Sequence, residues 1–225
     1  MKILAVDTAT PTCGVAIVDD ERVCASMTIN PGCTHSRSVM GLIKSALDAA
    51  CVSVPDIDAF AITTGPGSFT GLRIGMAVIK GLAMAAGKPV CGVSSLEALA
   101  APFVTSTALV CSIIDARKHE VYFAVYGNDE GRLVEVQPAG VGPVAAVTAA
   151  IKTPCLFVGT GAYAAKREIL ESLGESAVFV PAGSNLINPT FVAGLARTRL
   201  CEHGPDLPET LAPVYVRPPD AKKSL

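Results

Sequence analysis

The order of apolar segments in the first hundred residues constrains the fold of this chain more than any other feature. Three short apolar runs, separated by tight polar turns, come first and predict an antiparallel meander. Segments with helical spacing then alternate with further short apolar runs. The expected elements are strands at 2–7, 14–18, 22–29, 59–63 and 90–93 and helices at 35–50, 70–86 and 96–101. This β-β-β-α-β-α-β order predicts an α/β domain.

The second half of the chain repeats this order in a shorter form. Pro102 marks a boundary, so we expect domains at residues 1–102 and 103–225, the second smaller and degenerate. The expected elements are strands at 108–115, 120–126, 133–137, 156–158 and 178–180 and helices at 144–151, 162–173 and 189–201. The similarity of the halves rests on element order, since the sequence contains no repeated stretch.

Composition narrows the possible functions. Of the 225 residues, 50% are hydrophobic and 17% are charged, a balance that suggests additional buried surface at a partner interface. Lys and Arg number 18 and Asp and Glu number 20, which gives a formal charge of −2. A protein that grips RNA alone should show a basic face. The one tight basic cluster, Lys222-Lys223 with Arg217 nearby, is better explained as a solvated end.

Cysteines and apolar runs indicate the compartment. The eight cysteines form no C-x-x-C pair, and Asp7 interrupts the first apolar run too early for a signal peptide. The longest apolar run, Leu72 to Ala86, contains Arg73 and Lys80 and is too short to span a membrane. We therefore expect a cytoplasmic protein with free thiols and no membrane association.

Residues 65–71, Gly-Pro-Gly-Ser-Phe-Thr-Gly, join an expected strand to the second long helix and are the most distinctive motif. Amide groups at a helix start can bind an anion. The segment lacks the lysine of a P-loop, and Thr70 stands where the dinucleotide fingerprint needs glycine. A tight turn in which Ser68 or Thr70 caps the helix is the simpler interpretation.

Two acidic turns can also contribute to a site. Asp7-Thr8-Ala9-Thr10 follows the first strand and can present amides and hydroxyls to a phosphate, or its side chains can cap their own turn. Residues 115–120, Asp-Ala-Arg-Lys-His-Glu, concentrate charge between two strands. In both places the residue types favour a polar turn over a binding site.

The second long helix is apolar on nearly all sides, with Arg73 and Lys80 as its only charges. Small residues recur four apart along it, at Gly71 and Gly75 and again at Ala77, Gly81 and Ala85. A helix of this kind is either buried inside its own domain or shared with a partner, and the sequence leaves both possibilities open.

The histidines indicate neither catalysis nor metal binding. His35, His119 and His203 are far apart in the sequence and share no ligand spacing. Three scattered histidines support no Ser-His-Asp or Cys-His arrangement. We therefore expect no catalytic residue and no metal site.

Four blocks of sequence together point to a family. They are residues 3–10 (ILAVDTAT), 65–75 (GPGSFTGLRIG), 114–117 with 120–122 (IDAR, EVY) and 213–217 (PVYVR). In this order, and spread over nearly the whole chain, they resemble the TsaB (YeaZ) family of the bacterial threonylcarbamoyladenosine pathway. The second and third blocks are the specific ones.

The resemblance implies a fold, a reaction and partners. The fold should be that of the actin, sugar-kinase and Hsp70 (ASKHA) group, with two related α/β domains. A TsaB-type protein pairs with a TsaD-like catalytic subunit and works with a TsaE-like ATPase. Their complex transfers threonylcarbamoyl to N6 of adenosine 37 in tRNAs that read codons starting with A. The chain would be a non-catalytic platform that also forms homodimers and meets tRNA only through the complex.

The resemblance also implies a partner-binding surface, which the two long helices of the first domain build in that family. On this sequence the surface should include Met40 from the first helix. From the second helix it should include Leu72, Arg73, Gly75, Met76, Ile79, Lys80 and Ala83.

Departures from the catalytic sibling imply a vestigial active site. TsaD carries metal-binding histidines just after the strand that corresponds to residues 90–93, and residues 93–98 contain none. Ala116 and Arg117 would crowd phosphates beside Asp115. The possible vestigial nucleotide-binding residues are Asp7, Thr8, Thr10, Asp115, Gly159 and Gly161. We expect no cofactor, and a weakly bound or interface nucleotide stays open.

Two other functions stay open at this point. One is an ATP-dependent phosphotransferase or a peptidase, because the wider family has been labelled glycopeptidase. The other is a regulatory dimer with a different partner.

Overall fold

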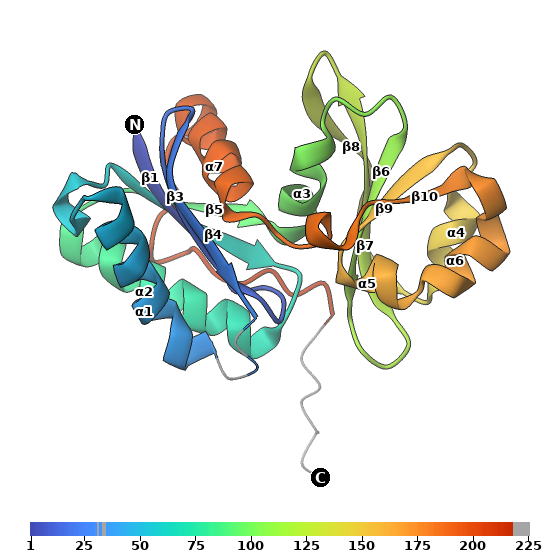
Figure 1. Cartoon of the computed structure of the whole chain (residues 1–225), viewed down its shortest axis with the longest axis horizontal. Helices are drawn as coiled ribbons and strands as arrows, with labels where there is room; N and C mark the ends of the chain where they lie inside the picture. The colour runs from blue at the N-terminus through green and yellow to red at the C-terminus, as the bar shows by residue number, and fades with distance from the viewer. Residues whose placement is uncertain (31, 33–34, 218–225) are drawn as a thin grey trace, which may run out of the picture.

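The computed structural model describes residues 1–30, 32 and 35–217 and folds them into two α/β units that lie side by side (Figure 1). Each unit is built on a five-stranded sheet with parallel and antiparallel pairs. The α/β prediction is therefore confirmed. Cys33 and the basic pair Lys222-Lys223 lie outside the described residues.

The first sheet begins with two antiparallel hairpin connections and continues with two strands parallel to β1. Its strands are β1 (Lys2–Asp7), β2 (Cys13–Asp19), β3 (Arg22–Ile29), β4 (Ala59–Gly65) and β5 (Val90–Ser94). Their spatial order is β3-β2-β1-β4-β5. The parallel pairs follow from the helices that connect these strands, since a parallel pair needs a long crossover.

The second sheet has the same arrangement. Its strands are β6 (Leu109–Asp115), β7 (Val121–Asp129), β8 (Arg132–Gly142), β9 (Cys155–Val158) and β10 (Ala177–Phe179). Their order, β8-β7-β6-β9-β10, matches that of the first sheet strand for strand. The predicted likeness of the two halves is confirmed at the level of topology.

Helices cover both sheets. They are α1 (His35–Ala50), α2 (Phe69–Ala86), α3 (Ser95–Ala100), α4 (Val144–Ala150), α5 (Thr160–Ala164), α6 (Lys166–Leu173) and α7 (Pro189–His203). Residues 162–173, expected as one helix, instead contribute to α5 and α6. The helix breaks at Ala165, whose backbone angles are φ −97° and ψ 10°.

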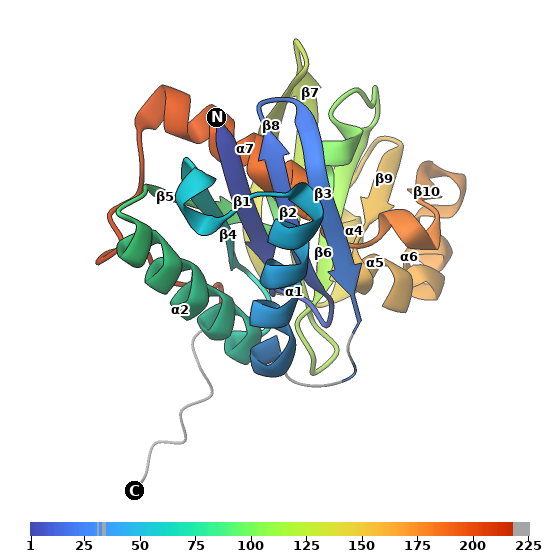
Figure 2. The same ribbon diagram turned by 60° about the vertical axis from the view of Figure 1, so that its left-hand side comes forward.

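Three apolar layers hold the molecule together. Helices α1 and α2 pack on one face of the first sheet, and α1 lies in front of its strands in Figure 2. Side chains of α4 and α6 pack against one face of the second sheet. Between the two sheets lies a third cluster, to which α3 and α7 contribute and which contains residues of both units. The two units therefore share this third cluster.

The expected division at residue 102 needs a correction at its far end. Helix α7 packs on β1 and β2 of the first sheet, although it follows the second sheet in sequence. The second unit is thus an insertion between α3 and α7. Element order alone did not reveal this return, because α7 carries no signal for the sheet on which it packs.

The residues after α7 run back over the first unit, and we call residues 204–217 the strap. Backbone bonds join Asp206 N to Val90 O (2.9 Å) and Val214 N to Thr64 O (2.8 Å). Leu211 is buried in the core beneath α2. At its end, Arg217 donates to Ala116 O (2.9 Å) in the second unit. The strap therefore connects both units.

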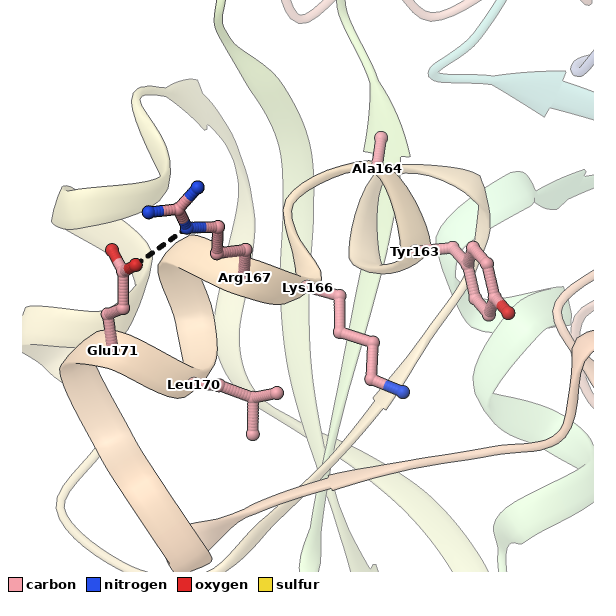
Figure 3. A pocket seen from close by; sticks show the side chains of 6 residues that line it. All are labelled: Tyr163, Ala164, Lys166, Arg167, Leu170 and Glu171. Atoms are coloured by element: carbon pink, nitrogen blue, oxygen red, sulfur yellow. Dashed lines mark hydrogen bonds and ion pairs between the residues drawn. The ribbon is translucent and has the colours of Figure 1, made fainter.

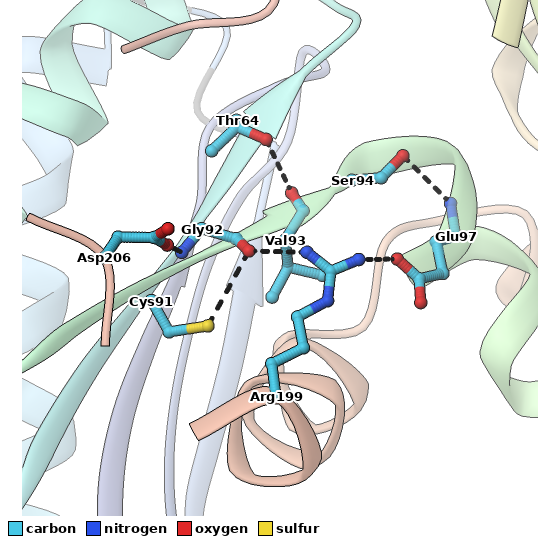
Figure 4. A network of polar contacts seen from close by, with 8 residues as sticks. All are labelled: Thr64, Cys91, Gly92, Val93, Ser94, Glu97, Arg199 and Asp206. Atoms are coloured by element: carbon cyan, nitrogen blue, oxygen red, sulfur yellow. Dashed lines mark hydrogen bonds and ion pairs between the residues drawn. The ribbon is translucent and has the colours of Figure 1, made fainter. Parts of the chain in front are cut away.

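A polar network ties α7 to β5 and α3 (Figure 4). Arg199 donates to Gly92 O (2.7 Å) and pairs with the Glu97 carboxylate. Gly92 N donates in turn to the carboxylate of Asp206 (2.7 Å). Burial raises the pKa of Glu97, and the charge of Arg199 acts in the opposite direction. The network gives the half-buried Glu97 a partner, which a buried carboxylate requires.

Helix α2 is the one described helix that is long and apolar enough to cross a membrane by length and composition alone. The run expected to be too short thus forms an 18-residue helix. A helix in the core of a globular protein meets the same criterion, and α2 packs one face on the first sheet.

Candidate functional site

The glycine-rich segment starts α2 through a side-chain cap. Ser68 Oγ accepts a hydrogen bond from Gly71 N (3.2 Å), and Ser68 N donates to Ala9 O (2.7 Å). The interpretation of this segment as a turn capped by Ser68 is confirmed. The bonds dock the start of α2 on the turn between β1 and β2.

Glycines just before and within the first turn of α2 allow a close approach to the β1–β2 turn. A Cβ on Gly67 would overlap Ala9 O, and one on Gly71 would overlap Thr8 O. Thr8 Oγ1 donates to Gly71 O (2.8 Å). These glycines therefore serve the packing of the helix on the strand end, where no side chain fits.

The inner face of α2 includes most of the residues that we expected to contact a partner. Leu72, Ile79 and Ala83 are 0% exposed and Met76 is 5% exposed, while a Cβ on Gly75 would overlap the Thr8 hydroxyl. The apolar pattern alone did not say which side faces the sheet. These five positions are corrected from surface residues to core residues of the first unit.

The outer face of α2 is apolar and partly exposed. We define it as Ile74, Ala77, Val78, Gly81, Leu82, Met84 and Ala85. Met84 is 67% exposed, and Met40 on the neighbouring α1 is 50% exposed. Of the expected contact residues, Met40 thus lies on the surface of α1.

The two charges of α2 are engaged within the chain. Arg73 Nε donates to the Tyr215 hydroxyl (2.9 Å), and its guanidinium lies 3.9 Å from the centroid of the Phe69 ring. Lys80 Nζ donates to Leu211 O (3.1 Å). Both charges hold the strap against the helix, so Arg73 and Lys80 flank the outer face rather than form its centre.

A cleft with a volume of about 910 Å³ lies between the two units. Of the possible vestigial nucleotide-binding residues, Thr10 and Asp115 line it. Thr10 Oγ1 lies 2.8 Å from Thr12 Oγ1, and Asp115 accepts a bond from Arg117 N (2.7 Å). Both side chains thus stabilise their own turns, as the sequence favoured.

Asp7 and Thr8 are buried and do not line the cleft. Asp7 Oδ1 accepts hydrogen bonds from Ala9 N (3.0 Å) and from the Thr63 hydroxyl (2.7 Å). Asp7 Oδ2 has no partner among the described residues. Burial raises the pKa of Asp7 to about 6, against the effect of these hydrogen bonds.

Gly159 and Gly161 do not line the cleft either. Gly159 has φ +106°, and a Cβ there would overlap Ile113 O. A Cβ on Gly161 would lie 2.7 Å from the Ile113 side chain. Their role is to bring the start of α5 close to β6, and their part in a vestigial nucleotide site stays a prediction.

The loop between β6 and β7 has an unusual backbone that sequence reasoning missed. Arg117, Lys118 and His119 follow one another with φ of 61°, 54° and 60°. This left-handed region costs side-chain-bearing residues about 1–2 kcal/mol each. Arg217 pairs with the Glu120 carboxylate and bonds Ala116 O, which fixes both ends of the loop. None of the three residues is glycine or asparagine, so no local signal announced the conformation.

The described histidines lie in separate places. His35 Nε2 lies 3.0 Å from Thr10 O and 3.1 Å from Thr12 O, which ties α1 to the β1–β2 turn. Within residues 1–30, 32 and 35–217, no three His, Cys, Asp or Glu side chains gather as a metal site would require.

A second, open hollow lies on α5 and α6 (Figure 3). Lys166 Nζ lies 5.1 Å from the Phe179 ring centroid, and Arg167 Nε donates to Glu171 (2.8 Å). These are contacts within one helix face and its strand, so the hollow is a weaker candidate than the cleft.

Comparisons with known proteins identify the family. A family model described as TsaD, tRNA N6-adenosine threonylcarbamoyltransferase, matches residues 31–200. The Escherichia coli tRNA threonylcarbamoyladenosine biosynthesis protein TsaB is 42% identical over 132 residues, which cover 58% of this chain and 57% of that protein. The Bacillus subtilis protein of the same name is 31% identical over 227 residues, covering 99% of this chain and 96% of that protein.

Solved structures agree with this. A Pseudomonas aeruginosa protein, described as similar to peptidase YEAZ, superimposes with a TM-score of 0.81 at 30% identity, over 96% of this chain and 99% of that one. Component A of the Acidaminococcus fermentans (R)-2-hydroxyglutaryl-CoA dehydratase gives a TM-score of 0.55 at 12% identity and shows the fold alone. The predicted two-domain ASKHA-like fold is confirmed. The chain belongs to the TsaB (YeaZ) family within the wider TsaD family.

Proposed function

We propose that this chain is a non-catalytic subunit of a complex that transfers threonylcarbamoyl to N6 of adenosine 37 in tRNAs reading codons that start with A. It pairs with a TsaD-like catalytic subunit, works with a TsaE-like ATPase in the cytoplasm, and also forms homodimers. Its relatives from E. coli and B. subtilis are named for the biosynthesis of this nucleoside, which supports the proposal.

The outer face of α2 is the observation that carries the proposal. Ala77, Gly81, Met84 and Ala85 are exposed on it, while the larger Ile74, Val78 and Leu82 are half-buried and also pack against the core of the first unit. The helix contains no acidic residue. Met84 on this face and Met40 on α1 are both exposed. Contiguous apolar surface of this kind marks protein–protein contacts, and methionine suits them because it adapts to a partner.

The cleft supports the non-catalytic part of the proposal. An ATP site of this fold needs glycines whose backbone is open to phosphates. In this chain Gly159 and Gly161 are closed against β6, and Asp7 is buried beneath the cleft. Four of the six residues that would hold a nucleotide, Asp7, Thr8, Gly159 and Gly161, are thus engaged in packing within the chain.

Reconstitution tests the proposal directly. TsaD-like and TsaE-like proteins, tRNA, ATP and the threonylcarbamoyl donor are combined with and without this chain, and modified adenosine is measured. We expect modification to depend on the chain, and we expect the chain alone to modify nothing. Equal modification without the chain contradicts the proposal.

A matched pair of variants tests the surface. Ala77→Glu places a charge on the outer face, and Ala149→Glu makes the same change on exposed α4 of the second unit. Because a charge buried at an interface without a partner is costly, we expect Ala77→Glu to weaken pairing with the TsaD-like subunit at least tenfold, by roughly 1.4 kcal/mol or more. Ala149→Glu should pair as wild type in the same calorimetric titration. Equal pairing by both variants rules out this face.

The enzyme alternative needs its own assay, since the P. aeruginosa relative is described by its similarity to a peptidase. The chain alone is titrated with ATP and Mg²⁺ and incubated with glycoprotein substrate. Micromolar ATP binding or turnover by the chain alone would replace the subunit proposal with an enzymatic one.

A further inference from the structure

The cleft between the units is lined by basic and aromatic side chains that the proposed function leaves unused. The basic residues are Arg117, Lys118 and Arg217, and the one carboxylate among the lining residues is Asp115. The lining carries three positive charges and one negative charge. Because Glu120, which does not line the cleft, pairs with Arg217, the local balance is +1, whereas the whole chain has a formal charge of −2. A local reversal of sign inside a concave surface attracts anions.

The basic wall of the cleft is held in a fixed shape. Arg217 is anchored by Ala116 O and by the Glu120 carboxylate. The left-handed turn exposes Arg117 and Lys118 beside it. A loop that keeps successive basic residues in a costly backbone conformation is a sign of a functional constraint.

The opposite wall carries an aromatic stack. The rings of Phe69 and Tyr215 lie 5.2 Å apart between centroids, and Arg73 stacks on Phe69 and donates to the Tyr215 hydroxyl. Phe69 remains 41% exposed, and both aromatic residues line the cleft. Flat rings combined with arginine are the surface on which nucleic-acid bases stack.

Phosphate-binding charges on one wall and a stacking surface on the other fit a polynucleotide better than a single nucleotide. The volume of about 910 Å³ is near the upper limit of small-molecule pockets. We propose that the cleft receives a single-stranded loop of the tRNA substrate. Arg117 and Lys118 contact its phosphates, and a base adds to the Phe69–Arg73–Tyr215 stack. The identity of this RNA rests on the proposed function.

The RNA contact adds to binding by the complex and is too small to hold RNA alone. Two or three phosphate contacts are fewer than those of proteins that bind nucleic acid independently. The negative charge of the whole chain therefore does not conflict with a basic cleft. The contact should appear as a change in the affinity of the assembled complex for tRNA.

The test compares two charge-removing variants in the assembled complex with the TsaD-like and TsaE-like partners. Arg117→Gly removes the cleft charge and suits the left-handed backbone, so it should fold at least as well as wild type. Lys152→Gly removes an exposed charge in the loop after α4 and is the control. Binding of a fluorescein-labelled anticodon stem-loop is followed by anisotropy at several salt concentrations, and KM and kcat for tRNA are measured.

For Arg117→Gly we expect about tenfold weaker stem-loop binding, a salt slope smaller by about one unit, and a raised KM for tRNA with kcat unchanged. Lys152→Gly should match wild type in all four. Wild-type affinity and salt slope in folded Arg117→Gly would overturn the inference. Displacement of the stem-loop by ATP, added until it saturates the cleft, would also overturn the inference. The natural ligand of the cleft would then be a free nucleotide.

Failure of this inference is separable from failure of the proposed function. If Arg117→Gly binds stem-loop as wild type while the wild-type chain still pairs with its partner and supports modification, the cleft proposal fails alone. If the wild-type chain neither pairs nor supports modification, the proposed function fails, and the tRNA contact, which rests on it, fails with it.

Discussion

The two units share one strand order but differ where the first strand of each sheet ends. In the first unit β1 ends at Asp7, which is fully buried, and β4 leads into the 18-residue α2. In the second unit β6 ends at the exposed Asp115, and β9 leads into the five-residue α5. The same topology thus produces a covered strand end in one unit and an open one in the other.

Because of this difference, one architecture provides two kinds of surface. A long helix docked through Gly71 on a buried strand end gives a rigid platform with one face free. A short helix followed by a break leaves the strand end and its loop open to the cleft. The first arrangement suits a protein partner, and the second suits a ligand between the units.

The largest effect on stability should come from a charge on the inner face of α2. Ile79→Glu places a charge on the inner face of α2, at a position that is 0% exposed. Leu170→Glu makes the same change at a 40% exposed position on α6 of the second unit. We expect Ile79→Glu to lower the free energy of unfolding by about 4 kcal/mol or more, and Leu170→Glu by less than about 1 kcal/mol. Urea titrations followed by circular dichroism measure both. Similar midpoints for the two variants would contradict the assignment of faces.

The next effect concerns the strand ends and depends on pH. The pKa of Asp7 is about 6 in the folded protein and near its ordinary value of 3.8 when unfolded. The folded state therefore holds this proton more tightly, and stability falls as pH rises through this window. Relative to Asp7→Asn, the wild type should lose up to roughly 3 kcal/mol between about pH 4 and pH 7.

The second unit supplies the control for this titration. Asp115→Asn removes an exposed carboxylate at the matching strand end and serves as the control for the same substitution in the second unit. Thermal melts of the three proteins across the same pH range give the comparison. Parallel curves for the wild type and Asp7→Asn would show that Asp7 does not titrate in this window.

The smallest effect concerns the glycines that dock each helix. Gly71→Ala and Gly161→Ala each introduce a Cβ against the backbone of the neighbouring strand end, at Thr8 and at Ile114. We expect each to cost roughly 2 kcal/mol because the helix must shift. Gly81→Ala, which meets nothing within 4 Å, should stabilise by about 0.5–1 kcal/mol. A cost for only one of the docking glycines would mean that the two helices are not held alike.

The sequence predicted the elements well because their periodicity is local. Strands, long helices and the cap at Ser68 all follow from residue types within one segment. The direction of α2 did not, since Leu72 and Leu82 are equally apolar while only Leu72 is fully buried. The side of α2 that faces the sheet is set by contacts distant in sequence, such as the bond from the Thr8 hydroxyl to Gly71 O, 63 residues away.

The candidate cleft was the harder part to foresee. Asp115 and Thr10 belong to motifs that the sequence singled out, and both line it. Phe69 and Tyr215 are 146 residues apart in sequence (215 − 69), and only the folded chain brings their rings together. The left-handed loop had no glycine to mark it, because Arg217 supplies the restraint from a distance.

The strap has a consequence for the order in which the molecule is completed during translation. Every strand of the inserted unit is synthesised before α7 and Leu211 leave the ribosome. The first unit, although it begins the chain, still lacks a layer of its core at that moment. Nascent domains otherwise fold from the N-terminus onwards. In this chain the inserted unit can close first, and the platform helix reaches its final packing only when the last segment arrives.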